Sequence, residues 1–200
     1  MTGPRLLAAL ALAIGVMCAA IVALVAPWDV AAHAVVRWTA RVSLVLFAAA
    51  YAARPLVQLR PTPLAKWLVR ERKWLGLAFA TSHAAHLAGI IAIASPDFGA
   101  FLRAQPPTNA IAAATFLLLF AMAFTSIDAV KARMSARRWK LLHRTGMHFA
   151  WISFAATYTG AVASSPVYAV PAAVILGVGA LRGAAFLRAR RRVAAARAAA

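Results

Sequence analysis

The chain has 200 residues, of which 64% are hydrophobic and only 13% are charged. Its 22 lysines and arginines outnumber four acids, which gives a formal net charge of +18. This composition excludes an ordinary soluble domain, and it argues against nucleic-acid binding because the basic residues are interleaved with long apolar segments instead of lining one soluble face. The sequence therefore predicts an all-α polytopic membrane protein with a single domain over residues 1–200.

Six apolar segments each have close to the 20 residues that an α-helix needs to cross a bilayer. They cover residues 6–26, 34–53, 74–95, 109–129, 141–163 and 167–187. The first has the charge pattern of a signal peptide, but it is long enough to span and no clear small-x-small cleavage motif precedes Pro27, so we expect a retained helix. The connections are short, and a six-helix transmembrane bundle is predicted.

Basic residues are concentrated in three segments, 54–73, 131–144 and 182–197, with Arg5 before the first span. Only Arg37, Arg41 and Arg103 fall on the opposite side of the predicted membrane. The positive-inside rule then places both termini in the cytoplasm and directs the third and fifth helices outward.

The sequence offers no redox centre of its own. Cys18 is the only cysteine, so one chain cannot form a disulfide, an iron–sulfur cluster or a cysteine-based zinc site. No Gly-rich fingerprint follows a strand-like segment, which argues against a flavin or nicotinamide domain. No catalytic acid, base or nucleophile is identifiable, and we expect an imported cofactor and an external source of electrons.

Two histidine pairs, His83/His86 and His143/His148, lie in or at the edge of the third and fifth predicted helices. Ionisable side chains inside a bilayer are costly and usually functional, and neutral imidazole is a common ligand of haem iron. His83 and His86 are three residues apart and share one helix face. His143 and His148 are five apart, which separates them by about 140° around the helix axis.

The depth of each histidine is estimated from the basic residues that begin its helix. His83 and His86 lie about 16 and 21 Å along the third helix, and His143 and His148 lie about 8 and 15 Å along the fifth. His148 matches the first pair best. The residues therefore favour a haem whose iron is held by two imidazoles, one from His83 or His86 on the third helix and one from His148 or His143 on the fifth. The alternative is that the histidines are structural.

Arg37 and Arg41 are four residues apart on one face at the outer start of the second helix. They either extend to lipid headgroups or pair with haem propionates, because arginine forms charge-assisted hydrogen bonds with carboxylates. His33 lies beside Asp29 at the same end, and we assign it no role.

Three motifs resemble the ferric reductase-like transmembrane domain family. They are Arg72-Lys73-Trp74-Leu75-Gly76-Leu77 followed by His86, the segment from Met122 to Ser126, and Trp139-Lys140-Leu141-Leu142-His143-Arg144 after a basic loop. The resemblance covers about residues 34–187 and includes similarity to the haem-binding membrane subunits of bacterial methionine sulfoxide reductase systems. His86 and His143 match the family motifs directly.

The resemblance implies a subunit in the inner membrane of a bacterium that binds one or two b-type haems. Such a subunit passes electrons from a cytoplasmic flavin reductase, which would carry the flavin, or from quinol to an outer-face acceptor such as a periplasmic reductase. It would not be a complete enzyme alone. Two alternatives stay open: a quinone-linked cytochrome b subunit that serves another partner, and a non-catalytic membrane protein acting in transport or assembly.

The sequence departs from the two-haem members of this family at two positions. Those relatives carry histidines 13 or 14 residues apart on each of two helices, but the corresponding positions here are Arg72 and Ala156. In that frame His86 would be an outer ligand and His143 an inner ligand, so the two would not share a haem. His83 and His148 are then needed as replacements, or only one haem binds with unusual ligation. We hypothesise one b-type haem whose iron is held chiefly by His86 and His148, with His143 as a competing or second-site ligand and His83 as a spare ligand or supporting group.

Overall fold

A computed structural model describes residues 2–106 and 109–198, and all regular elements in these ranges are helical. The long helices are α1 (Pro4–Leu24), α2 (Trp28–Leu59), α3 (Pro63–Ala94), α5 (Asn109–Phe124), α7 (Ala136–Val162) and α8 (Ala169–Ala198). The short elements are α4 (Phe98–Ala104), α6 (Asp128–Lys131) and the 3-10 helix η1 (Pro166–Tyr168). The all-α prediction is thus confirmed for the described residues.

Helix ends follow the capping residues of the sequence and not only its apolar limits. Thr62 accepts a hydrogen bond from the Ala65 amide at the start of α3, and Ser135 accepts one from the Arg138 amide at the start of α7. These caps satisfy amides that have no partner within the helix. They allow α3 and α7 to begin several residues before the predicted spans.

Four helical segments are long and apolar enough to cross a membrane: α1, α2, α3 and the segment formed by η1 and α8. A fifth is added if α4 and α5 are counted as one bent span. The prediction of six spans is therefore not confirmed. The remaining predicted span, the fifth at residues 141–163, corresponds to α7, whose apolar residues are interrupted by basic, histidine, threonine and glycine residues. The long apolar helices identify a multi-pass membrane protein.

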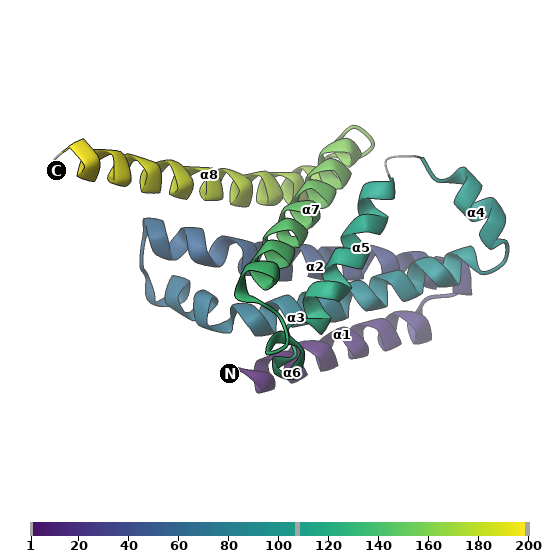
Figure 1. Ribbon diagram of the computed structural model, residues 1–200. Helices are drawn as coiled ribbons and strands as arrows, with labels where there is room; N and C mark the ends of the chain where they lie inside the picture. Colours follow the sequence, from purple (N-terminus) through teal and green to yellow (C-terminus); the bar gives the residue numbers. More distant parts are fainter. Residues whose placement is uncertain (1, 107–108, 199–200) are drawn as a thin grey trace.

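Helices α2 and α3 form the central pair and run side by side, while α1 lies along α3 and α8 along α2 (Figure 1). Helices α5 and α7 pack against each other and cross the central pair obliquely (Figure 1). Both termini point toward the end of the bundle that holds the α2–α3 connection (Figure 1). The cytoplasmic location of that end stays a prediction.

Three phenylalanines from three helices meet in the core. The ring of Phe47 on α2 lies 5.5 Å from Phe79 on α3 and 5.3 Å from Phe154 on α7, measured between centroids. Phe79 and Phe154 are 5.9 Å apart. Tilted aromatic pairs at such distances stabilise a core beyond the area that they bury. This triangle fixes α7 against the central helix pair.

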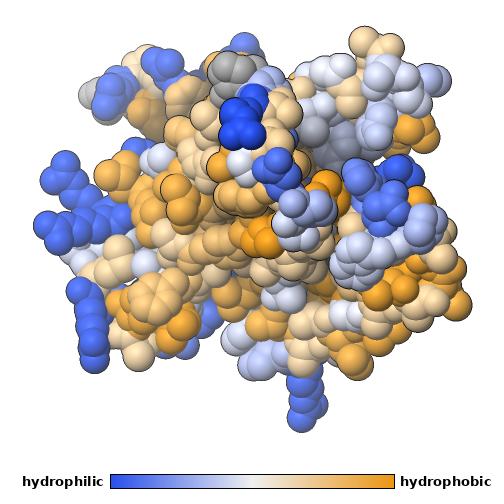
Figure 2. All heavy atoms as spheres, turned by 90° about the vertical axis from the view of Figure 1, so that its right-hand side faces the viewer, coloured by the Kyte–Doolittle hydropathy of each residue, from blue (hydrophilic) through white to orange (hydrophobic). Residues whose placement is uncertain are grey.

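Apolar side chains also cover much of the outside, as expected where lipid replaces water. Figure 2 shows broad hydrophobic areas between scattered hydrophilic groups. Leu24, Leu117 and Val170 are more than two-thirds exposed, at 83%, 74% and 71%. Exposed apolar surface of this extent fits an acyl-chain environment.

One acid is buried at the basic end of the bundle. Glu71 on α3 is 2% exposed, and its carboxylate accepts a 2.6 Å hydrogen bond from the Gly3 amide and a 2.9 Å bond from Arg70 Nε. A buried carboxylate requires such partners. Glu71 therefore ties the start of α1 to α3, a contact that the sequence patterns did not indicate.

Candidate functional site

His83 and His86 both turn toward α2, where polar groups hold one ring nitrogen of each. His83 Nδ1 lies 2.8 Å from Ser43 Oγ, and His86 Nδ1 lies 2.9 Å from the Val36 carbonyl oxygen. Their rings are stacked, with centroids 5.5 Å apart. The structure thus brings together the two histidines that the sequence placed on one face.

The hydrogen bonds around these rings define their tautomers. Ser82 Oγ donates to the Thr39 carbonyl at 3.0 Å, and Ser43 Oγ donates to Ser82 Oγ at 2.9 Å. The hydroxyl proton of Ser43 is already donated to Ser82, so Ser43 Oγ accepts the hydrogen bond from His83 Nδ1–H. His86 Nδ1 faces a carbonyl oxygen and must also be a donor. Each neutral ring consequently keeps a lone pair on Nε2, the atom through which imidazole binds a metal.

Aromatic side chains surround the pair. The His83 ring lies 4.8 Å from Phe79, 5.0 Å from Phe116 and 5.7 Å from Phe154. Phe116 on α5 also stacks on His86, at 6.1 Å and an interplanar angle of 17°. Phenylalanine rings from α3, α5 and α7 thus line this side of the histidine pair.

His148 on α7 belongs to a different group of residues. Its Nδ1 lies 3.3 Å from the Tyr51 hydroxyl on α2, and the two rings meet edge to face. The Arg182 guanidinium of α8 lies 4.6 Å from the centroid of the Tyr51 ring, a cation–π contact. His148 is thereby linked to α2 and α8, while its Nε2 makes no hydrogen bond with the described residues.

His143 lies near the start of α7 and stacks on Trp139, with ring centroids 4.0 Å apart. Its Nε2 is 3.3 Å from Thr125 Oγ1, and that hydroxyl donates to the Ala121 carbonyl at 2.8 Å. Thr125 must therefore accept the Nε2–H of His143, which leaves the lone pair on Nδ1. His143 is thus the one histidine of the four whose Nε2 is engaged.

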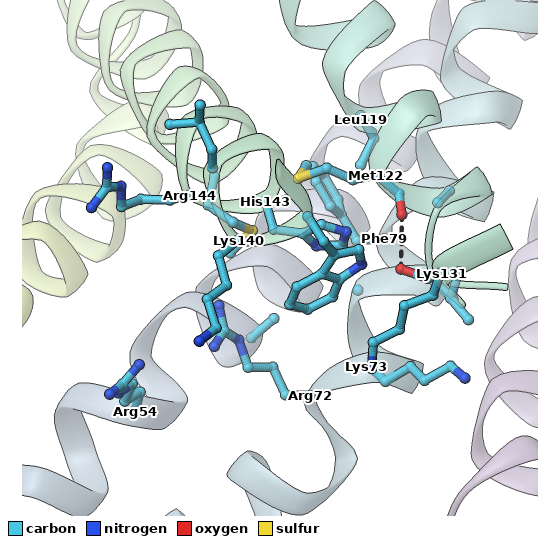
Figure 3. A pocket seen from close by; sticks show the side chains of 18 of the residues that line it. Arg54, Arg72, Lys73, Phe79, Leu119, Met122, Lys131, Lys140, His143 and Arg144 are labelled. Atoms are coloured by element: carbon cyan, nitrogen blue, oxygen red, sulfur yellow. Dashed lines mark hydrogen bonds between the residues drawn. The ribbon is translucent and has the colours of Figure 1, made fainter. Parts of the chain in front are cut away.

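A cavity of about 890 Å³ opens beside His143 between α2, α3, α5, α7 and α8. Its volume lies within the range of about 300–1,000 Å³ that is usual for cofactor and ligand sites. Figure 3 shows basic side chains on one side of it and apolar side chains on the other, with His143 between the two groups. The basic lining residues are Arg54, Arg72, Lys73, Lys131, Arg137, Lys140, Arg144 and Arg182.

One acid offsets part of this charge. Asp128 also lines the cavity, and its Oδ1 accepts a 2.8 Å hydrogen bond from Lys73 Nζ. The Lys73 ammonium lowers the pKa of Asp128 through this hydrogen bond and its charge. The carboxylate consequently stays ionised at neutral pH and joins α6 to α3 at the rim.

The structure does not bring His86 and His148 together. His86 contacts α2 at Thr39, whereas His148 contacts α2 at Tyr51. These two α2 residues are about 18 Å apart along the helix axis at 1.5 Å per residue. The side chain of Tyr51 shortens this separation only in part. A single iron bound to both histidines, as hypothesised from estimated depth, has no support in this arrangement.

Arg72 and Ala156, the two positions at which the sequence departs from the expected histidines, lie in different surroundings. Arg72 lines the same cavity as His143. Ala156 is exposed, whereas the buried residues of α7 recur every four positions at Gly146, Ala150, Phe154 and Tyr158. Near the C-terminal end of α7, the interior residue is therefore Tyr158 and not Ala156.

The outer arginines and the fifth histidine lie at the opposite end of α2 from the cavity. Arg37 is exposed, and Arg41 is half-buried with its guanidinium 4.8 Å from the Trp38 ring centroid. His33 is exposed, and its Nδ1 lies 2.7 Å from the Asp29 carbonyl oxygen.

Several polar residues around the histidines were not singled out in the sequence. They are Thr39, Ser43, Tyr51, Ser82, Thr125 and Tyr158. Thr39 and Ser43 stand one turn apart on α2, a spacing that places both on one face of the helix and is a recognisable signal for a polar stripe. Their pairing with particular histidines depends on how α2 and α3 are aligned.

Comparison with known proteins shows the family to which this chain belongs. Residues 37–155 match the family described as ferric reductase like transmembrane component. The chain belongs to this family. It is also 32% identical over 157 residues to the protein-methionine-sulfoxide reductase heme-binding subunit MsrQ of Ralstonia nicotianae (strain ATCC BAA-1114 / GMI1000), an alignment that covers 72% of this chain and 69% of the relative. No solved structure gives a significant match. The predicted family resemblance is confirmed.

Gly146 allows α5 and α7 to approach closely beside the cavity. A Cβ atom at this position would lie 2.6 Å from the sulfur of Met122 and 2.8 Å from its Cε. We expect Gly146→Ala to destabilise the protein by about 1 kcal/mol, because the flexible methionine can move only in part. Gly160→Ala on the same helix is the control, since no atom lies within 4 Å of its added methyl group. Equal thermal unfolding midpoints in detergent for the two variants would contradict this expectation.

Proposed function

We propose that this protein is a b-type haem-binding electron-transfer subunit of the bacterial inner membrane. It would pass electrons from a cytoplasmic flavin reductase or from quinol to an outer-face acceptor, such as a periplasmic reductase. Family membership and the name of the heme-binding relative support this function. The observation that carries it is His86, whose Nδ1–H is held by α2 while its Nε2 lone pair is free.

The residues present fit a haem. A ring nitrogen that is oriented by a backbone carbonyl is the usual arrangement of an imidazole that binds metal. Within residues 2–106 and 109–198, no three His, Cys, Asp or Glu side chains gather as they would around a bare metal ion. Single imidazoles beside aromatic surfaces suit a macrocycle, which brings four ligands of its own. When bound, haem supplies one-electron exchange between ferric and ferrous iron.

We assign His86 to the principal haem. His83, on the same face, is a supporting group or replacement ligand because its Nε2 lone pair is also free. His148 and His143 lie on α7 near the basic cavity and are proposed to serve a second haem. His148 has the more accessible Nε2, whereas His143 must first give up its bond to Thr125. The number of haems follows from the ratio of haem to protein in the purified sample.

The basic cavity is proposed to serve the electron-donor side. Its arginines and lysines would bind haem propionates or other anionic groups through charge-assisted hydrogen bonds. Arg37 and Arg41 are the corresponding candidates at the other end of α2. The chain itself contributes ligands, a low-dielectric surrounding and positive charge, and it depends on a separate donor and acceptor.

The direct test is the absorption spectrum of the full-length protein purified after expression with ample haem. We expect a Soret band and, after reduction, the band of a b-type cytochrome. Stopped-flow reduction by a flavin reductase with NADH, compared with reduction by a quinol, then identifies the donor class. A protein that has no Soret band after haem-replete expression would disprove the proposed function.

A non-catalytic membrane protein with structural histidines is the second candidate. One observation favours it: each of the four histidines hydrogen-bonds a residue of a neighbouring helix or loop. In that case titration of the purified protein with haem would give no saturable binding. A quinone-linked cytochrome b subunit would instead bind haem and accept electrons only from the quinol.

A further inference from the structure

Tyr158 carries a buried hydroxyl group with no partner. The residue is 5% exposed, and its Oη makes no hydrogen bond within residues 2–106 and 109–198. Its ring stacks on Phe154 with centroids 6.1 Å apart and planes 7° from parallel. The hydroxyl therefore has a well-defined position. A buried hydroxyl without a hydrogen bond is unfavourable, so such a group calls for an explanation.

Charge near Tyr158 indicates which kind of partner is missing. Arg41 of α2 lies close enough to Tyr158 to interact with it electrostatically. A hydroxyl donor beside a guanidinium suits an anionic oxygen. Two of the four acids, Glu71 and Asp128, are paired with basic groups at the opposite end of the bundle, Asp97 caps α4, and Asp29 is exposed at the start of α2. None of the four hydrogen-bonds the Tyr158 hydroxyl, so an anion from outside the chain fits this position.

The position of Tyr158 relates it to the proposed haem ligand. The Phe154 ring lies 5.7 Å from His83. Tyr158 stacks on Phe154, and His83 stacks on His86. Tyr158 is thus connected to the proposed ligand His86 through the adjoining rings of Phe154 and His83.

We propose that Tyr158 and Arg41 together bind a carboxylate of the cofactor held by His86. This inference rests on the proposed haem function and adds a binding residue to it. The Tyr158 hydroxyl donates one hydrogen bond to the carboxylate, and the Arg41 guanidinium supplies the opposite charge. A phosphate of a lipid headgroup has related chemistry, and the experiment below separates the two sources.

The test combines a protein change with a cofactor change. The full-length wild-type protein and the Tyr158→Phe variant are each loaded with haem and with haem dimethyl ester, whose propionates no longer carry charge. We expect esterification to weaken binding about tenfold in wild type, in line with the loss of a charge-assisted hydrogen bond. In Tyr158→Phe the effect of esterification should be clearly smaller, and Arg41→Gln should behave similarly.

A second readout separates a ligand role from a packing role. Without haem, Tyr158→Phe should unfold at a higher temperature than wild type, because the variant no longer buries an unpaired hydroxyl. With haem, it should release the cofactor faster to apomyoglobin. Tyr168→Phe is the matched control, since Tyr168 lies beside Tyr158 with centroids 6.4 Å apart and is partly exposed. We expect it to change neither property.

The outcomes are distinct. If wild type binds no haem, the proposed function fails. If wild type binds haem but esterification has the same effect in wild type and Tyr158→Phe, the carboxylate assignment is overturned. In that case, binding of anionic phospholipid by wild type and its loss in Tyr158→Phe would identify a lipid phosphate as the partner instead.

Discussion

Replacing His86 with alanine lowers the haem content of the purified protein by one haem per chain. The variant loses an Nε2 lone pair that α2 orients and that Phe116 flanks. The smaller side chain also leaves Thr39 and Val36 without their imidazole partner and removes the stacking on Phe116. Reduced-minus-oxidised spectra and a pyridine haemochrome assay measure the change.

Two comparisons make the result for His86 specific. His33→Ala removes an exposed imidazole at the same end of the bundle and should leave the haem content unchanged. Added imidazole should restore part of the band in His86→Ala, because it can enter the space that the side chain vacates. The same spectra of His148→Ala report on the second proposed site. An unchanged band in both His86→Ala and His148→Ala would contradict the assignment of both histidines.

Gly179→Ala destabilises the protein by about 2–3 kcal/mol, because it overpacks the interface between α7 and α8. A Cβ atom at this position would lie 2.6 Å from Cζ2, 2.7 Å from Nε1 and 2.8 Å from Cε2 of Trp151. An indole ring is rigid, unlike the methionine that faces Gly146. Moving it also disrupts the 2.9 Å hydrogen bond from Trp151 Nε1 to the Ile175 carbonyl.

Gly177 offers a matched control on the same helix. No atom lies within 4 Å of a Cβ built at Gly177, so Gly177→Ala adds only the helix propensity of alanine. That change should be neutral or stabilising by up to about 1 kcal/mol. The thermal midpoints of the two variants in one detergent give the comparison. A Gly179→Ala midpoint at or above that of wild type would show that α8 moves freely relative to α7.

The sequence predicted the helices better than their arrangement. The length of the apolar segments located all six long helices. In lipid, the backbone N–H and C=O groups of a single segment can all be hydrogen-bonded only when the segment is helical. Segment length did not predict that polar residues such as Thr62 and Ser135 extend these helices. The prediction of six spans is not confirmed, since α7 is helical without being apolar throughout.

Depth along a helix was the weakest basis for prediction. His148 was matched to His86 by counting residues, which assumes that both helices are aligned with the membrane normal. In the structure α7 crosses α2 and α3 obliquely (Figure 1), so equal distances along the two axes do not give equal positions. The shared face of His83 and His86 was predictable because it depends on one helix alone. Tyr158 was detectable from the four-residue spacing on α7, but its unpaired hydroxyl required the neighbouring helices.

His86 donates its Nδ1–H to the Val36 carbonyl, and this hydrogen bond limits where the imidazole can take up a proton. An imidazole can take up a proton only at a free lone pair, and Nε2 is the single such position on this ring. Once Nε2 is bound to iron, His86 has no site at which to gain a proton, and the backbone carbonyl cannot accept one. A change in the charge of the iron is therefore not balanced at this residue by protonation, and the midpoint potential associated with His86 should vary little with pH.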